Sequence, residues 1–589
     1  MKYKIVGNNN YEELNISQLE SELLHRRGIN DINKFLNVSK DNIENINNYD
    51  HMEDGYNLLK KHIHNVGEEI GLLVDCDTDG YSSSATMYQY LKDICPGIQI
   101  TYFMHNGKEH GLTDKNILKK IKNSNIKLLI IPDAGSIDYI EHKELKEIGI
   151  DILVLDHHEA KKYSNDAVVI NNQLSTKVHN KNLSGVGVVY KFCKYIDKKI
   201  NKNFADKYLD LVALGNIADV IDLRELETRY LVLQGLKQIN NQFLIELINR
   251  NAYEIDKKGI NILSIGWVII PKINAVIRTG TKQEKTDLFR AFIGEEETSE
   301  RTYKGKTTIE TLQQKMSRIA TNKHNTQNNK VKKCQEEIEN QITNINDKVL
   351  IINGTGILDN TLTGLVANKL ASKYKRPILL LQKKKDEEDI YGGSARNYNG
   401  FAIQDFNEFC TNSHLFSMCE GHPNAFGIKI NKNNINNMKK YANDKLKDVQ
   451  LINDKVYVVD FAFNMKDLKK NSIVKDIGLL KDVWGNGIDE PYFVIKNVII
   501  SSKEIKQYGT KKNVVKFTVH NINFIKEYAS QDFYDKITCK PERGFKREKI
   551  LTLEILGKFQ INNYKNKIQP QIAIIDYNII KAEKPEDIF

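Results

Sequence analysis

Short hydrophobic runs that end on acidic residues dominate the first 225 residues of the chain. Three of these runs lead directly into Asp75, Asp133 and Asp156. Amphipathic segments with a helical period separate the runs. Strands that alternate with helices in this way are typical of a parallel α/β sheet, which we expect between residues 66 and 225.

The first acidic cluster places three carboxylates at alternate positions, Asp75, Asp77 and Asp79, before Gly80. Because side chains alternate between the two faces of a strand, we expect these carboxylates to start on one side of the backbone. Carboxylates crowded in this way repel one another unless a cation neutralises them. A solvated acidic turn explains such a motif equally well when it stands alone.

The other runs add ligands of the same kind. Asp156 is followed by His157 and His158, and a further apolar run at 211–218 leads into Asp219. The ligands at the carboxyl ends of strands in an open parallel sheet should converge at one edge. Oxygen and imidazole ligands suit Mn²⁺ or Mg²⁺, and two such ions can lie about 3.5–4 Å apart. The predicted metal ligands are Asp75, Asp77, Asp79, Asp133, Asp156, His157, His158 and Asp219.

These motifs resemble those of the DHH phosphoesterase superfamily, and within it the chain is most similar to the RecJ family of single-strand-specific exonucleases. The matching motifs are Asp77-x-Asp79-Gly80, Asp133-x-Gly135, Asp156-His157-His158 and Gly215-x-x-Ala218-Asp219. The expected chemistry is two-metal hydrolysis of a phosphodiester. The predicted catalytic residues are Asp77, Asp79, Asp133, Asp156, His157, His158 and Asp219, with one histidine open to an acid–base role and Asp75 as a support or ligand.

Composition narrows the class of protein. The 589 residues suffice for several domains, and a net charge of +10, from 86 basic and 76 acidic residues, permits a polyanionic partner without proving one. Seven cysteines without C-x-x-C spacing indicate reduced thiols and neither a zinc site nor a disulfide framework. The N-terminus is polar and hydrophobic runs stay well below 18 residues, so we expect a cytoplasmic protein without a membrane span.

The resemblance continues along most of the chain and divides it into five regions. We expect a helical N-terminal preamble at 1–65, the DHH catalytic domain at 66–225, and a helical region ending in a long connecting helix at 226–345. A second α/β unit, the DHH-associated domain, should occupy 346–450. Residues 451–589 contain five or so strand-like segments separated by polar turns, which predicts an OB-like β domain.

Two segments outside the metal motifs resemble substrate-binding motifs of the family. Residues 271–278 resemble the P-R-x-N-A-x-G-R segment of the family, although Lys272 and Ile277 depart from it. The resemblance implies that Asn274 and Arg278 contact the DNA strand or its phosphates. In the second α/β unit, 392–396 and 420–427 resemble the G-S-x-R and G-G-H-x-x-A-x-G motifs. They imply that Ser394, Arg396, Gly421 and His422 bind substrate; a buried ion pair and a satisfied loop histidine are the alternatives.

Basic residues also occur in the predicted β domain. Lys511, Lys512, Arg543, Lys546 and Arg547 lie near Tyr508 and Phe545 in the sequence. Charge and stacking of this kind suit single-stranded DNA, and ordinary surface lysines with core aromatics are the alternative.

The resemblance implies a single-stranded-DNA exonuclease with 5′-to-3′ polarity, mononucleotide products, two divalent cations (Mn²⁺ preferred, or Mg²⁺) and a role in recombination and repair. It leaves single-strand-binding protein or a helicase open as partners, and a monomer is expected. Two other classes stay open. One is a superfamily phosphoesterase for short oligonucleotides or cyclic dinucleotides, and the other is a DNA-binding scaffold with an inactive site.

Overall fold

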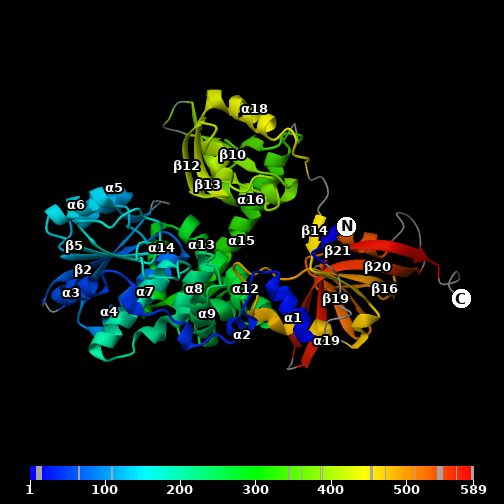
Figure 1. Ribbon diagram of the computed structural model, residues 1–589, viewed down its shortest axis with the longest axis horizontal. Coiled ribbons are helices and arrows are strands. Elements are labelled where there is room, and N and C mark those ends of the chain that lie inside the picture. Colours follow the sequence, from blue (N-terminus) through cyan, green and yellow to red (C-terminus); the bar gives the residue numbers. More distant parts are fainter. Residues whose placement is uncertain are drawn as a thin grey trace. The chain divides into compact units, whose positions relative to one another are not determined.

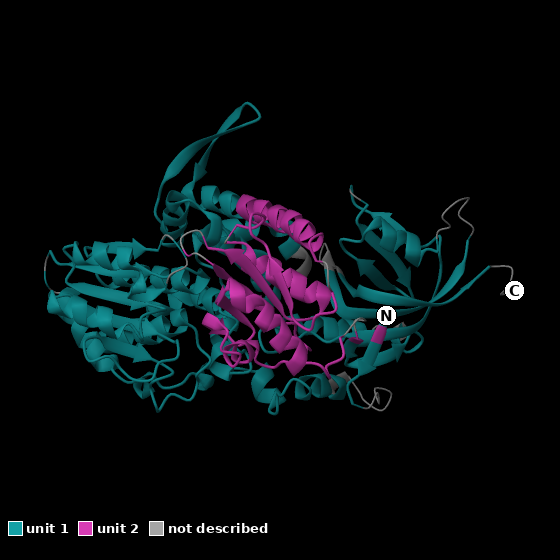
Figure 2. Cartoon of the chain, turned by 90° about the horizontal axis from the view of Figure 1, so that it is seen from above, with its two compact units in different colours: residues 1, 3–320, 457–589 teal, residues 2, 321–456 magenta. Residues whose placement is uncertain are grey.

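The computed structural model describes the chain except residues 8–15, 64, 66, 106, 108–109, 343–344, 360, 385–386, 388, 452–455, 471, 511, 540–547, 565–566 and 585–589. The described chain forms two compact units, coloured separately in Figure 2. Unit 1 contains residues 1, 3–320 and 457–589, and unit 2 contains residues 2 and 321–456. The five predicted regional boundaries follow a finer division and stay a prediction.

A five-stranded parallel sheet forms the first part of unit 1 (Figure 1). Its strands, in spatial order, are β3 (Gln99–Met104), β2 (Glu69–Val74), β4 (Leu128–Pro132), β5 (Asp151–Asp156) and β6 (Val168–Asn171). Strands β2, β4 and β5 are buried along almost their whole length. Strands that are buried on both faces of a parallel sheet have continuous hydrophobic sequences, as these strands do. The predicted parallel α/β sheet is confirmed.

Helices cover both faces of this sheet. Leu72 packs in the core beneath one set of helices, and its neighbour Leu73 packs in the core on the opposite face, as strand alternation requires. The covering helices are α3 (Met52–Ile63), α4 (Thr78–Ile94) and α7 (Gly185–Ile200) on the first face, and α5 (Lys115–Lys122) and α6 (Tyr139–Glu147) on the second.

The first acidic cluster does not continue the strand. Strand β2 ends at Val74, Asp77 is the N-cap of α4, and Asp79 lies in the first turn of that helix. The Asp77 carboxylate accepts a hydrogen bond from the Gly80 backbone N–H at 2.8 Å, which is the usual role of an N-cap aspartate. The expectation that Asp75, Asp77 and Asp79 start on one side of an extended strand is therefore wrong.

A helical region follows the sheet. The apolar run before Asp219 is a buried helix, α8 (Leu209–Ala218), which is apolar around most of its circumference because it lies inside unit 1. The next helices are α9 (Leu226–Lys237), α10 (Gln242–Arg250), α11 (Ala252–Lys258), α12 (Ile262–Ser264), the π-helical turn Ile265–Ile269, α13 (Ile270–Thr279) and α14 (Lys282–Phe292).

A hairpin that the sequence analysis missed interrupts this region. It consists of β7 (Thr298–Tyr303) and β8 (Lys306–Thr311). The predicted connecting helix begins after it, as α15 (Leu312–Glu339), and passes from unit 1 into unit 2 at residue 321 (Figure 2). A long helix is therefore present near the end of the predicted region 226–345, although it stops at Glu339.

The segment Ile262–Thr279 is long and apolar enough to cross a membrane by length and composition, and it is the one such helix among the described residues. About 61% of this segment is buried inside the protein. Ile265, Ile269 and Ile273 are part of the main hydrophobic core. Its apolar residues are thus used in packing unit 1.

Unit 2 is built on a second five-stranded sheet, with the order β12-β13-β11-β10-β9. Strands β9 and β10 pair in parallel, and the other described neighbours are antiparallel. The strands are β9 (Leu350–Asn353), β10 (Ile378–Lys383), β11 (Ile390–Arg396), β12 (Phe416–His422) and β13 (Ala425–Asn431). Its helices α16 (Thr363–Tyr374), α17 (Phe406–Thr411) and α18 (Ile435–Lys445) contribute to two hydrophobic clusters.

The C-terminal part of unit 1 is a seven-stranded sheet with the order β15-β16-β20-β21-β19-β18-β17. Its strands are β15 (Phe461–Asn464), β16 (Phe493–Ser501), β17 (Lys506–Tyr508), β18 (Val514–Val519), β19 (Ile522–Lys526), β20 (Ile550–Tyr564) and β21 (Lys567–Glu583). Helices α19 (Ser472–Leu479) and α20 (Gln531–Ile537) accompany it. The predicted strand β14 (Val456–Val459) pairs instead with β1 (Lys2–Ile5), so the N-terminal preamble begins with a strand.

Candidate metal centre

The carboxyl edge of the parallel sheet carries three buried acids. Asp75 follows β2, Asp133 follows β4, and Asp156 is the last residue of β5; each side chain is at most 2% exposed. Two further carboxylates come from helix ends, because Asp79 lies in the first turn of α4 and Asp219 is the C-cap of α8. The site therefore combines strand ends with helix ends.

The N-terminus of α7 holds the Asp79 carboxylate. The backbone N–H groups of Gly185 and Val186 donate to it at 2.7 and 3.3 Å, and the Ser184 hydroxyl donates at 3.1 Å. Free N–H groups at a helix N-terminus stabilise negative charge in this way. The glycine-containing segment before α7 thus serves a protein carboxylate, which the sequence analysis did not identify.

Two glycines leave room for the buried carboxylates. A Cβ atom on Gly185 would lie 2.2 Å from Asp133 Oδ1, and a Cβ atom on Gly215 would lie 2.1 Å from Asp79 Oδ1. Both distances are far below van der Waals contact. Any side chain at either position would displace a carboxylate from the centre of the cluster.

The two histidines face different carboxylates. His157 Nε2 lies 3.3 Å from Asp133 Oδ1 and 3.6 Å from Asp219 Oδ2. His158 Nδ1 lies 2.8 Å from Asp156 Oδ1. Among the described residues, Asp133, His157 and His158 form one group with ligand atoms within 4.8 Å of one another, and Asp79, His157 and Asp219 form a second. His157 belongs to both groups.

Burial and repulsion between neighbouring carboxylates raise the pKa values of two acids in this cluster. Burial, and then the charges of Asp79 and Asp77, raises the pKa of Asp133 well above its ordinary value. The same causes raise the pKa of Asp219 to about 8. Asp133 Oδ1 is buried and has no hydrogen-bond partner in the described structure. A divalent cation would neutralise this repulsion and bind Asp133 Oδ1, so the residues present fit a metal.

Asp156 differs from the other acids because its oxygens are satisfied. Oδ1 accepts hydrogen bonds from the backbone N–H groups of His157 and His158, and Oδ2 accepts one from Ser136. Burial raises its pKa, but the hydrogen bond and charge of His158 outweigh burial and leave the pKa below its ordinary value. Asp156 therefore orients His158, and its predicted role as a direct ligand stays a prediction.

Asp75 lies in a third group, with Cys76 and His110. His110 Nδ1 is 2.5 Å from Asp75 Oδ2, and the hydrogen bond to Asp75 raises the pKa of His110 to about 11. Asp77, the N-cap of α4, lies outside all three groups; burial and the charge of Asp75 raise its pKa. Of the eight predicted ligands, five fall in the two groups that share His157.

Both predicted contacts on α13 lie near the acidic motif. Asn274 Oδ1 accepts a hydrogen bond from the Thr78 hydroxyl at 2.8 Å. Arg278 is exposed and close enough to Asp77 to be affected by its charge. Lys272, which departs from the family pattern, is buried and donates to the Val268 carbonyl at 2.7 Å, so it is occupied in packing.

The four predicted substrate contacts of unit 2 lie on two strands, β11 and β12, that flank β13. Ser394 and Arg396 lie on β11 and pair with Gly427 and Ala425 of β13. Gly421 and His422 lie on β12 and pair with Phe426 and Ala425. The Arg396 guanidinium donates to its neighbouring Ala395 carbonyl at 2.7 Å. The two motifs are thus brought together by strand pairing, without burial of the His422 side chain.

The C-terminal part of unit 1 contacts the backbone on either side of Asp219. Asn486 Nδ2 donates to the Ile217 carbonyl at 3.2 Å, and the Asn486 carbonyl accepts from Leu223 N–H at 3.1 Å. These contacts hold the segment that carries Asp219. Of the basic and aromatic residues predicted for DNA binding, Lys512 and Tyr508 are described and exposed, whereas Lys511, Arg543, Phe545, Lys546 and Arg547 lie outside the described residues.

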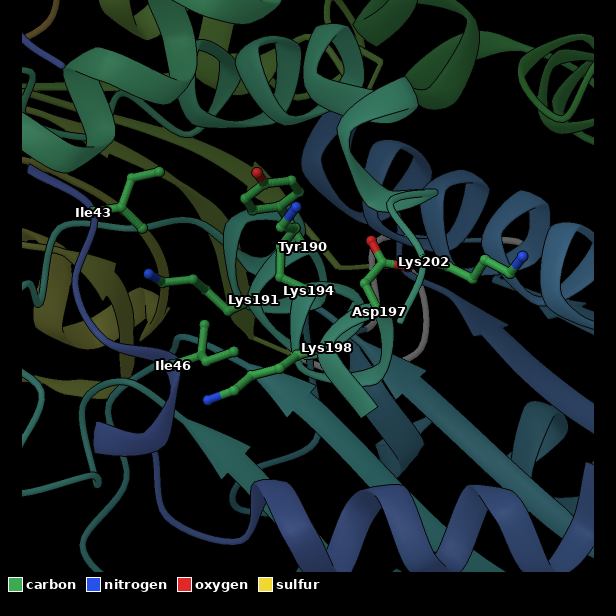
Figure 3. A pocket seen from close by; sticks show the side chains of 8 residues that line it. All are labelled: Ile43, Ile46, Tyr190, Lys191, Lys194, Asp197, Lys198 and Lys202. Carbon is green, nitrogen blue, oxygen red and sulfur yellow. The ribbon is translucent and has the colours of Figure 1, made fainter. Parts of the chain in front are cut away.

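A cavity beside α7 is lined by residues outside this cluster (Figure 3). It has a volume of about 300 Å³ and is lined by Ile43, Ile46, Tyr190, Lys191, Lys194, Asp197, Lys198 and Lys202. Lys191 is buried and paired with Glu227, and Lys194 lies 3.1 Å from Asp206. The cavity contains none of the predicted site residues.

Comparison with known proteins places the chain in a family. Residues 69–216 match the DHH family N-terminal domain, and residues 459–576 match the RecJ OB domain. The chain is 36% identical to the SPbeta prophage-derived protein YorK of Bacillus subtilis (strain 168), provisionally named a single-strand DNA-specific exonuclease, over the full length of both. It is 25% identical to RecJ of the same organism, over 96% of this chain and 68% of that protein.

Solved structures show the same fold. RecJ from Thermus thermophilus in complex with Mn²⁺ matches with a TM-score of 0.69 and 17% identity, over 99% of this chain and 80% of that one. The Mg²⁺ complex of RecJ from the same organism matches with a TM-score of 0.63 and 16% identity, over 99% and 79% of the two chains. The predicted fold class, a parallel-sheet DHH domain with a C-terminal OB domain, is confirmed. The chain belongs to the RecJ family of single-strand DNA-specific exonucleases within the DHH superfamily.

Proposed function

We propose that this protein is a metal-dependent exonuclease that hydrolyses single-stranded DNA from the 5′ end and releases mononucleotides. The observation that carries the proposal is the pair of ligand groups that share His157. This arrangement suits two divalent cations, with Mn²⁺ preferred or Mg²⁺, and occurs in a chain with full-length similarity to YorK. Recombination and repair are the proposed cellular setting, in the cytoplasm.

Asp79, Asp133, His157, His158 and Asp219 would hold the cations. Bound divalent cations supply Lewis-acid stabilisation of charge on a phosphodiester and lower the pKa of a coordinated water. The fold buries several carboxylates close together, and a bound cation would relieve the repulsion between them. Asp77 would contribute a further carboxylate from the N-cap of α4. Asp75 would support the carboxyl edge of the sheet through its contact with His110.

His158 is suited to proton transfer as well as to metal binding. Its Nδ1 is fixed by Asp156, while more than half of its side chain is exposed. Burial lowers the pKa of His158, but the hydrogen bond and charge of Asp156 outweigh it and raise the pKa to about 9. The imidazole would therefore carry a proton near neutral pH in the absence of metal. Because Nδ1 is bonded to Asp156, Nε2 would serve one of two roles, as a cation ligand or as the donor of a proton to the leaving oxygen of the phosphodiester.

Substrate contacts are proposed in each unit. Asn274 and Arg278 would contact the strand beside the acidic motif in unit 1. In unit 2, Arg396 offers a planar guanidinium suited to a phosphate; Ser394 lies on the same strand, and Gly421 and His422 lie across β13 on β12. The proposed partner is single-stranded DNA, bound by a monomer, with single-strand-binding protein or a helicase as further partners.

A digestion time course tests this function directly. Purified protein with Mn²⁺ would receive one long single strand labelled at either its 5′ or its 3′ end. We expect immediate release of 5′ label as mononucleotide, while 3′ label stays on long and then shortening strands. The variant His157→Ala should lose at least about a thousandfold in rate, equivalent to about 4 kcal/mol of barrier, while its thermal unfolding stays cooperative.

Two outcomes would contradict the proposal. Cleavage confined to substrates of two to five nucleotides would favour the small-substrate phosphoesterase. Tight binding of single strands without metal-dependent turnover, by folded protein, would favour the DNA-binding scaffold. The reverse pattern of label release would overturn the polarity alone.

A further inference from the structure

The β7–β8 hairpin is exposed along most of both strands and contains no residue of the proposed metal centre. Its two-residue loop, Lys304-Gly305, has φ angles of +50° and +77°, which is the backbone of a type I′ turn. Figure 2 shows the hairpin extending from the teal unit, just before the chain enters the helix that changes to magenta.

The two faces of the hairpin differ in charge. Cross-strand pairs lie on the same face, so one face carries Ser299, Arg301, Tyr303, Lys306, Thr308 and Glu310. Glu300, Thr302, Thr307 and Ile309 occupy the other. Near the turn, the first face therefore places positive charge around an aromatic ring, and its one acid, Glu310, lies at the far end of the hairpin.

Tyr303 is 60% exposed and lies between cations. The Arg301 guanidinium carbon is 5.3 Å from the centre of the Tyr303 ring, and Lys304 Nζ is 5.5 Å from it. Arg301, Lys304 and Lys306 form no ion pair with any described residue. At the root of the hairpin, burial and the charges of Arg301 and Arg318 lower the pKa of Arg250, whereas Glu310 and Glu246 oppose the shift, so the excess of positive charge is confined to the turn end.

A purely structural role explains this face poorly. Isolated two-stranded hairpins are marginally stable, and packing of an aromatic residue into a core would stabilise this one. Instead, the ring is exposed, and the two acids of the strands do not face the cations near the turn: Glu310 is buried and paired with Arg318, and Glu300 lies on the opposite face. Unstacked bases bind exposed aromatic rings, and phosphates bind adjacent Lys and Arg, in proteins that bind single strands.

We propose that the hairpin is a second binding site for single-stranded DNA, apart from the metal centre. Tyr303 stacks on a base, and Arg301, Lys304 and Lys306 contact the phosphates on either side of it. The inference rests on the proposed function because it assumes the same substrate. Its consequence is that long strands bind more tightly than strands too short to occupy both sites.

Binding and cleavage by full-length variants test this site. One variant is Tyr303→Ser, and a second combines Arg301→Gln, Lys304→Gln and Lys306→Gln. The matched control combines Lys115→Gln, Lys119→Gln and Lys120→Gln on α5, which removes the same charge from exposed positions. Fluorescence anisotropy with a labelled strand of about 40 nucleotides, in EDTA and over a range of salt, measures affinity without cleavage.

We expect Tyr303→Ser to weaken binding of the long strand about tenfold, through the loss of one stacked base. The triple hairpin variant should reduce the slope of log affinity against log salt by about 2, roughly 0.7 for each phosphate contact. The α5 control should stay within twofold of the wild type. Cleavage of a four-nucleotide strand with Mn²⁺ should be unchanged in all three.

Several results would overturn the inference. Wild-type affinity and slope in both hairpin variants, together with normal cleavage by the wild type, would reject the hairpin site and leave the proposed function intact. Equal losses in the α5 control would show a general effect of charge. If the hairpin variants lost affinity for duplex DNA and kept wild-type affinity for single strands, the hairpin would be a duplex-binding site and the inference would be wrong. Absence of both single-strand binding and cleavage in the wild type would reject the proposed function and this site together.

Crosslinking provides a readout that stability changes would not mimic. A strand containing bromodeoxyuridine, irradiated in complex with the wild type, should attach to a peptide containing Tyr303. Attachment to other peptides alone would contradict the stacking role.

Discussion

The two five-stranded sheets of this protein place their polar motifs in opposite environments. In unit 1, Asp75, Asp133 and Asp156 lie at the ends of parallel strands and are almost completely buried. In unit 2, Arg396 and His422 lie on antiparallel strands, and His422 is exposed. Sequence motifs of similar length thus produce a buried charged cluster in one unit and an accessible polar surface in the other.

Burial in unit 1 and exposure in unit 2 suit the two sets of polar residues to metal binding and to substrate binding, respectively. Buried carboxylates raise each other's pKa and destabilise the fold unless a cation or proton neutralises them. Exposed groups remain hydrated, so they have little effect on stability and are available to an incoming ligand. We therefore expect metal to act mainly through the unit 1 cluster and substrate affinity to depend on the unit 2 residues.

The largest predicted effect comes from Asp133→Asn compared with Arg396→Gln. Asparagine keeps the shape of Asp133 and tolerates its φ of +66°, but it removes one charge from the cluster. We expect cleavage to fall at least about a thousandfold and metal-free stability to rise by about 0.5–2 kcal/mol. Differential scanning calorimetry with and without Mn²⁺, beside the digestion assay, measures both effects.

Arg396→Gln provides the contrast. At Mn²⁺ a hundredfold above its dissociation constant, the wild type and Arg396→Gln should each gain about 2.7 kcal/mol, whereas Asp133→Asn should gain much less. Arg396→Gln should weaken substrate affinity. Equal metal-dependent stabilisation of Asp133→Asn and the wild type would mean that the buried cluster is not the metal site.

A smaller effect is expected from Gly215→Ala. The added methyl group would lie 2.1 Å from Asp79 Oδ1 and 2.5 Å from Val186 Cγ1, so the carboxylate or α7 must move. We expect a loss of about 1–3 kcal/mol in stability, together with lower activity and weaker Mn²⁺ binding. Chemical denaturation and calorimetric metal titration measure these changes.

Gly266→Ala is the matched control. It is also a helical glycine in unit 1, but its added methyl group would lie 3.5 Å from Ile217, an ordinary contact. It should be neutral or stabilise the protein by up to about 1 kcal/mol, because alanine favours helix more than glycine does. Similar losses in both variants would show that helical glycine itself, and not space for Asp79, is responsible.

The sequence predicted the buried parallel strands because their burial produces unbroken hydrophobic runs, as in β4 and β5. It also located the acids at their ends. It misplaced Asp77 and Asp79 on an extended strand, because capping of α4 outweighed continuation of β2. It missed β7 and β8 because both strands are polar on both faces and bury little.

Long-range geometry was beyond the sequence. The proximity of His157 to Asp219, the hydrogen bonds from the start of α7 to Asp79, and the pairing of β1 with β14 each join distant segments. Residue type and spacing suggest candidates for such contacts, but packing decides which atoms meet. For this reason Asp133 and Asp156, equivalent in the sequence pattern, have opposite pKa shifts in the structure.

His142 tests whether burial alone makes the sheet domain sensitive to protonation. It lies on α6, fully buried, with Nδ1 3.1 Å from the Ser164 hydroxyl and Nε2 without a hydrogen-bond partner in the described structure. Burial lowers its pKa from 6.5 to about 4, although the charge of Asp166 opposes the shift. Between these values the unfolded chain binds more protons than the folded one, so this histidine reduces stability as pH falls from about 6.5 to about 4.

The full shift corresponds to about 3 kcal/mol. His142→Gln should remove most of this acid-dependent loss while changing stability at pH 8 much less. Urea denaturation of metal-free protein at several pH values between about 4 and 8 measures the difference. If the variant loses stability with acid as steeply as the wild type, other groups govern this range. If the slope disappears, a buried base outside the metal cluster is enough to make this domain acid-sensitive, and metal is not required for that behaviour.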